Sequence, residues 1–238
     1  MDSANLVLAA VAIALGAIVQ SVSGVGGGFI MVPLLAMIDV SYLPGPMIFA
    51  TLSLSILMAW REREHIDQRL VWWISLATVP GAALGAWLLI RVPADRLGLI
   101  FGGTILLAIV ITSLGLKPVL NRATAVVAGL VAGTMGASSG IGAPPIAVLY
   151  QDRSGPDIRA TLALIYTLCS LLIVGVLASF GEFNLRSLQT GFLLMPGMLL
   201  GYALSRPLTV RLGRGSAARY GVLAVSAVAA VTLIVDSL

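Results

Sequence analysis

The sequence predicts an all-α protein that crosses the membrane several times. Of its 238 residues, 59% are hydrophobic and only 10% are charged, whereas a soluble domain carries about 25% charged residues. The charged residues also fall into short clusters, which leave long uncharged runs between them. Because these runs are continuously apolar and do not alternate, they favour membrane helices over a β-barrel.

Most of the uncharged runs have about the length of one membrane crossing. About 20 apolar residues, rising about 1.5 Å each, span the hydrocarbon core as a helix. The runs of suitable length are 40–60, 70–90, 97–116, 160–181, 187–205 and 220–235. Two further runs, 3–38 and 123–151, contain 36 and 29 residues and exceed a single crossing. The segments between runs are too short for a second, soluble domain.

Each of the two long runs is interrupted by a glycine-rich segment. Residues 20–28 read QSVSGVGGG, and residues 136–145 read GASSGIGAPP. Glycine weakens a helix by about 1 kcal/mol and proline by about 3 kcal/mol, so neither run is expected to form one continuous helix. A broken membrane helix leaves backbone groups unpaired, so these breaks are expected inside the protein or along a cavity.

The two breaks align with each other at an offset of 116 residues. Residues 23–26 (SGVG) fall on residues 139–142 (SGIG). The same offset, without a gap, relates two further pairs of segments: Thr51-Leu52 with Thr167-Leu168, and Pro80-Gly81 with Pro196-Gly197. The sequence therefore predicts a tandem duplication with halves 1–118 and 119–238 that form one membrane domain.

The placement of Lys and Arg predicts the topology. If each long run crossed once, the two sides would hold 8 and 6 basic residues; if each run breaks and returns, they hold 11 and 3. The positive-inside rule favours the second arrangement and makes the larger set cytoplasmic. That set is Arg61, Arg63, Arg69, Lys117, Arg122, Arg153, Arg159, Arg206, Arg211, Arg214 and Arg219, against Arg91, Arg96 and Arg186.

Both termini are then expected outside. Each half has five membrane segments: a broken or re-entrant first segment, its return arm and three spanning helices. Because five is an odd number, the second half starts on the opposite side of the membrane, and the two halves should be inverted relative to each other. Inverted repeats with paired broken segments are typical of transporters whose binding site lies at the repeat interface.

Residues 24–28 (GVGGG) followed by 32–34 (VPL), together with 140–145 (GIGAPP), resemble the sulfite exporter TauE/SafE family. The resemblance covers essentially the whole chain. It implies a transporter of sulfur-containing anions, such as sulfite or organosulfonates, usually directed outward and in a bacterial inner membrane. One departure is Ala143, where the family often has glycine; we expect it to change the fit of the substrate and not the mechanism.

The residues of the breaks suit an oxyanion. Glycines let the backbone approach a ligand closely, and helices that restart near Phe29 and Pro145 would direct N–H groups and positive dipole ends inward. The candidate substrate-binding residues are Gln20, Ser21, Ser23, Gly24, Gly26, Gly27, Gly28, Thr51, Ser138, Ser139, Gly140, Gly142, Pro144, Pro145 and Thr167. The competing interpretation is that the small residues only allow close helix packing.

The acidic residues suggest how transport is driven. All ten Asp and Glu lie in loops or at the ends of the runs, whereas proton or sodium coupling usually places a carboxylate inside the membrane. An inside-negative potential contributes about 2.3 kcal/mol per charge per 100 mV to anion efflux. We therefore expect potential-driven alternating access, with the halves rocking around a neutral site. The alternatives are a channel for a small neutral solute and a proton-coupled anion carrier.

Other function classes find no support in the sequence. A nucleophilic serine needs a base within hydrogen-bond reach, and the single histidine, His65, lies in a charged loop. A metal site would need a cluster of His, Cys or carboxylates, and none is apparent. We expect neither an enzyme nor a cofactor. The basic residues follow helix ends and form no nucleic-acid stripe. The expected partners are a small anion and the lipid bilayer, and a homo-oligomer is compatible with the sequence.

Overall fold

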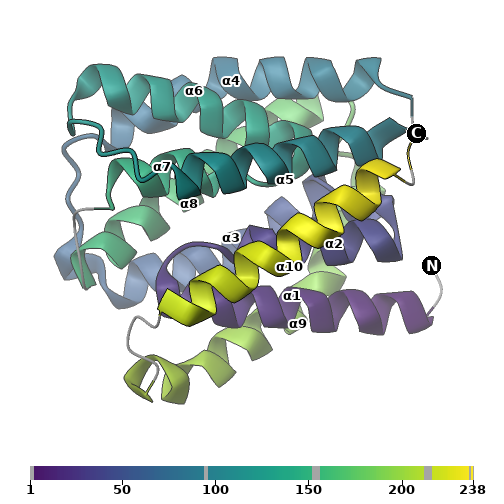
Figure 1. Ribbon diagram of the computed structural model, residues 1–238, viewed down its shortest axis with the longest axis horizontal. Helices are drawn as coiled ribbons and strands as arrows, with labels where there is room; N and C mark the ends of the chain where they lie inside the picture. Colours follow the sequence, from purple (N-terminus) through teal and green to yellow (C-terminus); the bar gives the residue numbers. More distant parts are fainter. Residues whose placement is uncertain (1–2, 94–95, 152–155, 212–215, 236, 238) are drawn as a thin grey trace.

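The computed structural model describes residues 3–93, 96–151, 156–211, 216–235 and 237, and these residues contain helices and no strands (Figure 1). The helices before residue 118 are α1 (Ser3–Ser23), α2 (Gly27–Ile38), η1 (Val40–Tyr42), α3 (Gly45–Arg61), η2 (Arg63–His65), α4 (Val71–Arg91) and α5 (Leu97–Ser113). Those after it are α6 (Arg122–Ser139), α7 (Ala143–Leu149), α8 (Pro156–Ser179), α9 (Leu185–Arg211) and α10 (Ser216–Val235). The all-helical prediction is confirmed.

Several of these helices can cross a membrane. Within the described residues, four are long and apolar enough: Ala4–Ser23, Val71–Arg91, Asp157–Ser179 and Leu185–Ser205. Large apolar side chains on the outer faces of the helices are well exposed, for example Leu76 at 64% and Val228 at 68%. A soluble protein rarely exposes so much contiguous apolar surface, whereas lipid tails cover it. The helices are those of a multi-pass membrane protein.

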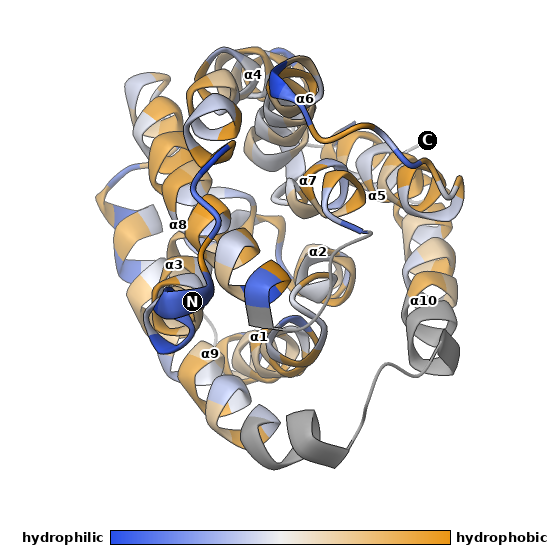
Figure 2. Cartoon of the chain, turned by 90° about the vertical axis from the view of Figure 1, so that its left-hand side faces the viewer, coloured by the Kyte–Doolittle hydropathy of each residue, from blue (hydrophilic) through white to orange (hydrophobic). Residues whose placement is uncertain are grey.

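The helices pack in pairs around two short central ones. Helix α4 packs along α6, and α1 packs along α9; α3 contacts α8 and α9, α8 contacts α4, and α5 packs on α10. The end-on view of Figure 2 shows the α4/α6 pair at the top and α1 with α9 at the bottom. Helices α2 and α7 lie between these pairs, where α2 contacts α1 and α10, and α7 contacts α6 and α5.

Both long runs break where the sequence predicted. Helix α1 ends at Ser23, and Gly26 precedes α2 with a φ of 94°; α6 ends at Ser139, and Gly140 follows with a φ of 88°. Positive φ values are readily adopted only by glycine, so these residues allow the chain to turn sharply.

The return arms α2 and α7 are shorter than a membrane crossing. Helix α2 folds back antiparallel along α1, since Gly27 lies against Gln20 and Gly16 against Met31. Its 12 residues extend about 18 Å, and the seven residues of α7 about 10 Å. Both lengths fall below the roughly 30 Å of the hydrocarbon core, so neither return arm is long enough to cross the membrane by itself. We call α1 with α2, and α6 with α7, the two hairpins.

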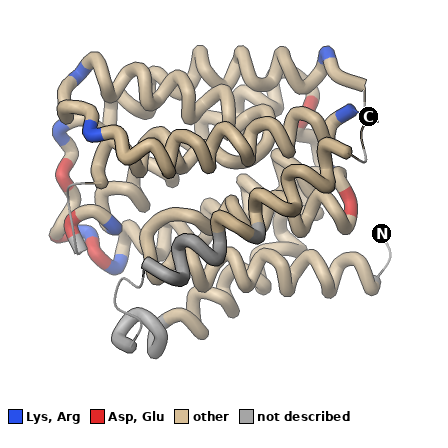
Figure 3. The backbone as a smooth tube through the Cα atoms, viewed as in Figure 1, with Lys and Arg blue, Asp and Glu red and all other residues tan. Residues whose placement is uncertain are grey.

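Charged side chains distinguish the two ends of the molecule. Helix α1 begins and α10 ends at the same end, at the right in Figure 1. Figure 3 shows most of the described Lys and Arg at the opposite end, where α3 ends with Arg61 and α6 begins with Arg122. We call this the arginine-rich end. Arg153 and Arg214, which the sequence analysis assigned to the same side, lie outside the described residues.

Candidate functional site

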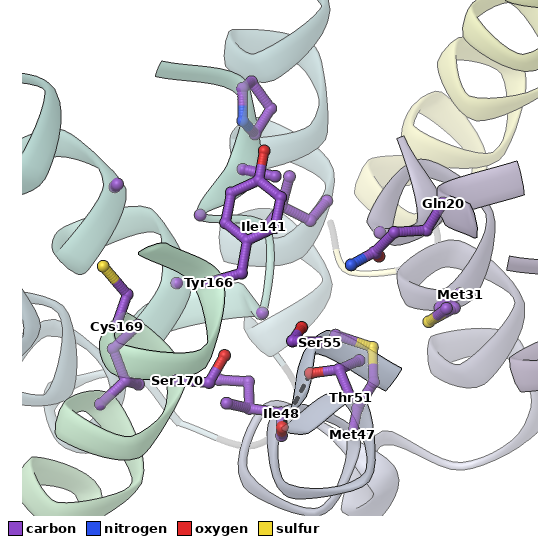
Figure 4. Close-up of a pocket in the computed structure, with 18 of the residues that line it drawn as sticks. Gln20, Met31, Met47, Ile48, Thr51, Ser55, Ile141, Tyr166, Cys169 and Ser170 are labelled. Carbon is purple, nitrogen blue, oxygen red and sulfur yellow. Dashed lines mark hydrogen bonds between the residues drawn. The ribbon is translucent and has the colours of Figure 1, made fainter. Parts of the chain in front are cut away.

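A cavity of about 70 Å³ lies between the two breaks. By the usual measure of 10–15 Å³ for each water, it has room for about five water molecules, which is comparable to a small oxyanion. Both hairpins line it, together with α3 and α8. Figure 4 shows Gln20 reaching into this space from α1, Thr51 and Ser55 from α3, and Tyr166 and Ser170 from α8.

The start of α2 forms one wall of the cavity. Gly26, Gly28 and Phe29 line it, and no side chain caps the helix at Gly26. The first N–H groups of a helix lack intrahelical partners and carry the positive end of the helix dipole. This end of α2 is therefore a source of hydrogen-bond donors for an anion.

The start of α7 lines the cavity next to α2, through Gly142, Ala143 and Pro144. A Cβ on Gly28 would lie 3.9 Å from the carbonyl oxygen of Gly140, so the two breaks are in contact. Helix α7 offers fewer donors than α2, because Pro144 and its neighbour Pro145 have no N–H. The site is thus chemically asymmetric, with backbone donors mainly from the first hairpin.

Polar side chains complete the cavity from the other side. Thr51 Oγ1 donates to the carbonyl of Ile48 at 2.7 Å, so its lone pairs and the neighbouring Ser55 remain near the cavity. The Tyr166 hydroxyl is buried and has no hydrogen-bond partner among the described residues. An unpaired buried hydroxyl costs about 1–3 kcal/mol. This hydroxyl therefore remains available as a hydrogen-bond donor.

Tyr166, Ser55 and Ser170 were not among the residues singled out from the sequence. On α8, Tyr166 and Ser170 lie one helical turn apart and both line the cavity. This pair of polar residues in an apolar segment was the available signal. The duplication points to the neighbouring Thr167 instead, which is not in the lining.

The structure brings together part of the predicted site. Those that line the cavity are Gln20, Gly26, Gly28, Thr51, Gly140, Gly142 and Pro144. Those that are not in its lining are Ser21, Ser23, Gly24, Gly27, Ser138, Ser139, Pro145 and Thr167. Every serine in the second group bonds to its own helix: Ser21 and Ser23 donate to Ala17 and Val19, and Ser138 and Ser139 donate to Met135.

The other residues outside the lining have structural neighbours. Thr167 donates to the carbonyl of Ala163 at 2.8 Å. A Cβ on Gly27 would lie 2.8 Å from the carbonyl oxygen of Gly16, so Gly27 allows close packing of α2 on α1. Gly24 lies under the side chain of Arg159. For these positions the packing interpretation describes the geometry.

The cavity itself is electrically neutral. None of the described residues that line it is Asp, Glu, Lys, Arg or His. Cys169 lines it and has its Sγ 3.2 Å from Thr78 Oγ1. No group of three His, Cys, Asp or Glu that could hold a metal ion occurs among the described residues. Of the acids, Asp2, Asp95, Asp152 and Asp236 lie outside the described part of the chain.

Comparison with known proteins identifies one family. The model of the sulfite exporter TauE/SafE family matches residues 8–233, which includes both hairpins and the cavity. No match was found among curated proteins or among solved structures. The family assignment therefore rests on nearly the whole chain.

Proposed function

Because this chain belongs to the sulfite exporter TauE/SafE family, we propose that it exports a small sulfur-containing oxyanion, sulfite or an organosulfonate, through the cavity between its hairpins. The observation that supports this most directly is a neutral cavity lined by the uncapped start of α2 and by Tyr166, whose hydroxyl has no partner among the described residues.

A neutral site suits a substrate that must also leave. Backbone N–H groups, the Gln20 amide and the Ser55 and Tyr166 hydroxyls can each donate to an oxyanion, as N–H groups at helix starts commonly do. Thr51 can donate only by giving up its bond to the Ile48 carbonyl. A hydrogen bond to a charged group contributes about 1.5–3 kcal/mol. Several such bonds give moderate affinity without a fixed positive charge in the cavity to trap the anion.

The helix contacts support an inverted duplication. The offset of 116 residues pairs α1 to α5 with α6 to α10 in order. The contact of α4 with α6 then corresponds to that of α9 with α1, the contact of α3 with α9 to that of α8 with α4, and the contact of α2 with α10 to that of α7 with α5. Two halves related by a pseudo-two-fold axis require this exchange, and such repeats support alternating access.

The membrane potential supplies the driving force in this proposal. The described residues that line the cavity include no carboxylate that could couple transport to protons, and an inside-negative potential favours anion efflux by about 2.3 kcal/mol per charge per 100 mV. The arginine-rich end is cytoplasmic by the positive-inside rule, which puts both termini outside a bacterial inner membrane.

The test is uptake of radiolabelled sulfite into proteoliposomes under a potassium-diffusion potential of either sign. Flux that reverses direction with the sign of the potential is the expected result. Absence of sulfite movement under both signs would overturn the proposal. Movement that ignores the potential would instead support an electroneutral, proton-coupled carrier or a channel for neutral solutes.

A further inference from the structure

Arg159 and Glu62 form an ion pair that joins the two halves of the chain. Arg159 lies in the first turn of α8, and Glu62 directly follows the last residue of α3. The Arg159 Nη2 is 2.8 Å from Glu62 Oε1, and its Nε is 3.2 and 3.3 Å from the two carboxylate oxygens. The side chains are only 28% and 18% exposed. The guanidinium is therefore held in a fork by a partly shielded carboxylate.

Both residues follow the spacing of the residues that line the cavity from α3 and α8. On α3, Ile48, Thr51 and Ser55 line it at helical spacing, and Glu62 follows seven residues after Ser55. Seven residues make about two helical turns, or about 10 Å, so Glu62 returns to the same face of α3.

The same spacing holds on α8. Arg159 precedes Tyr166 by seven residues. Its Cγ would lie 3.2 Å from a Cβ on Gly24, two residues before the cavity-lining Gly26. The ion pair therefore lies about two helical turns, or about 10 Å, from the cavity-lining Tyr166 and Ser55, toward the arginine-rich end, and neither of its residues lines the cavity itself.

We propose that Arg159 captures the oxyanion at this end of the pathway, and that Glu62 holds the guanidinium while no anion is present. A guanidinium fork binds a carboxylate and a sulfur oxyanion with the same geometry, so the two compete for one partner. The neutral cavity then receives the anion from a charged entry point. This inference rests on the proposed function, because it assigns an entry point to the same anion.

The experiment compares single substitutions in vesicles with sulfite supplied at the arginine-rich face. Arg159→Gln should raise the half-saturating sulfite concentration by roughly tenfold or more, the effect of losing a charge-assisted hydrogen bond. Glu62→Gln should lower it, because the guanidinium loses its internal competitor. Arg61→Gln, which removes an exposed charge next to Glu62, serves as the control and should change little.

Opposite changes of the half-saturating sulfite concentration in the two variants distinguish anion capture from a purely structural role of the ion pair. If both substitutions raise the half-saturating concentration or abolish transport, the pair only holds the halves together and the inference is wrong. Equilibrium binding of sulfite to the purified variants repeats the comparison without requiring turnover. A wild-type protein that neither moves nor binds sulfite would contradict the proposed function itself, whereas transport without the opposite shifts contradicts only the role of Arg159.

A different observation concerns how the hairpins pack on the other helices. Gly201 of α9 lies against the carbonyl of Ala14 on α1, and Gly85 of α4 lies against the carbonyl of Thr134 on α6. The offset of 116 makes Gly85 the counterpart of Gly201, but the counterpart of Ala14 is Leu130. Leu130 lies four residues before Thr134, so the two equivalent interfaces differ by about one helical turn.

The same displacement recurs one turn away. Gly197 would place a Cβ 2.6 Å from the carbonyl oxygen of Ala10, and Gly81, its counterpart, lies against Leu130. The counterpart of Ala10 is Val126, again four residues before Leu130.

It also recurs on other helices. Gly24 lies against Arg159 of α8, whereas Gly140 lies against Met47 of α3. The counterpart of Arg159 is Leu43, four residues before Met47. Three contact sets thus show the same displacement of the hairpins relative to α3, α4, α8 and α9.

We infer that the two hairpins slide together by one helical turn past α3, α4, α8 and α9 during transport. Helices α1 and α6 run in opposite directions (Figure 1), so exchanging the two registers moves both hairpins the same way, toward the end where α1 begins, by about 6 Å. Gly28 and Ile141 keep the hairpins in contact. The slide would carry their wall of the cavity past Thr51 and Tyr166. One-turn ratchets of packed helices have precedent as switching transitions.

Spin-label distances test the slide in the otherwise unaltered protein, because the native Cys169 is buried. The exposed positions are Ala4 and Ala123 on the hairpins, and Gln68 and Leu185 next to or on the other helices. Cysteines are introduced two at a time, as the pairs Ala4 with Gln68, Ala123 with Leu185, and Ala4 with Ala123. Between the two states, the Ala4–Gln68 distance should lengthen by about 6 Å, because Ala4 moves away from the end where Gln68 lies. The Ala123–Leu185 distance should shorten by about 6 Å, because Ala123 moves toward the end where Leu185 lies. Ala4–Ala123 should not change.

The states are populated by adding sulfite and by reversing the potential across the vesicle. If the Ala4–Gln68 and Ala123–Leu185 distances both lengthen or both shorten, or if the Ala4–Ala123 distance changes, the halves rock and the slide is wrong. Transport with all three distances constant would also overturn the slide. If the wild-type protein does not transport sulfite, the proposed function fails. The slide is then tested on the distance distributions measured without anion. It predicts a second population in which the Ala4–Gln68 distance is longer and the Ala123–Leu185 distance is shorter.

Discussion

Gly28 of α2 lies against Ile141 in the second break, with the position of a Cβ on Gly28 3.6 Å from Ile141 Cγ1. This is an ordinary van der Waals distance, so the space at Gly28 accepts one methyl group. Gly28 lines the cavity, and a longer side chain would enter it. The contact therefore joins the two hairpins and defines one wall of the site.

Gly28→Leu should strongly impair sulfite transport, while Gly28→Ala should retain it. The leucine side chain overfills a cavity of about 70 Å³, and overpacking costs about 1–3 kcal/mol, or roughly fivefold to hundredfold in affinity. Initial rates of sulfite flux in proteoliposomes measure the effect. Gly103→Leu is the matched control, because no atom lies within 4 Å of a Cβ at that position of α5. Equal loss in both leucine variants would contradict the assignment of the cavity.

Thr51 and Thr167 occupy equivalent positions in the duplication but different environments. Thr51 lines the cavity, and Thr167 does not. We expect the Thr51 hydroxyl to turn from the Ile48 carbonyl to the bound anion. Thr51→Val should then raise the half-saturating sulfite concentration by roughly tenfold, since a hydrogen bond to a charged group contributes about 1.5–3 kcal/mol. Thr167→Val should leave it unchanged. Concentration dependence of flux for both variants checks this, and similar effects at the two positions would argue for a site symmetric about the repeats.

Tyr166→Phe should separate stability from binding. Removing a buried hydroxyl that has no partner among the described residues relieves a desolvation cost, so the unfolding temperature should hold or rise. The affinity for sulfite should fall, because the cavity loses a donor. Thermal unfolding and equilibrium binding of the same purified protein measure the two effects. A lower unfolding temperature with unchanged affinity would assign Tyr166 to packing.

Gly133→Ala should destabilise the protein by about 1–3 kcal/mol. A Cβ there would clash with the carbonyl oxygen of Thr78 and lie 2.8 Å from the Ala82 nitrogen, so α4 and α6 would have to separate. Gly175→Ala on α8 meets no atom within 4 Å and should stabilise its helix by up to about 1 kcal/mol. Unfolding in detergent with increasing denaturant compares the two. Equal free energies of unfolding would show that the α4/α6 contact is looser than described.

The equilibrium accumulation of sulfite should report the charge that crosses. About 2.3 kcal/mol per charge at 100 mV corresponds to roughly 50-fold accumulation for one net negative charge. The ratio of internal to external label at a series of clamped potentials gives the slope. A slope of zero, with transport intact, would indicate that a proton accompanies each anionic charge.

The sequence alone determined the helical membrane class, the positions of both breaks and the family resemblance. These features depend on local properties: the length of apolar runs, and the conformational preferences of glycine and proline at 20–28 and 136–145. The structure places α2 and α7 directly after those segments, and the family match covers both.

Only the tertiary structure decided which side chains line the cavity. In helices that are apolar on every side, periodicity does not show which face points inward. Tyr166, Ser55 and Ser170 were therefore missed, and Ser21 and Ser138 were included although they bond to their own helices. The Arg159–Glu62 pair joins residues 97 positions apart, and the one-turn difference in register arises from how hairpins dock against the opposite half. Both are consequences of long-range packing, which local patterns in the sequence do not encode.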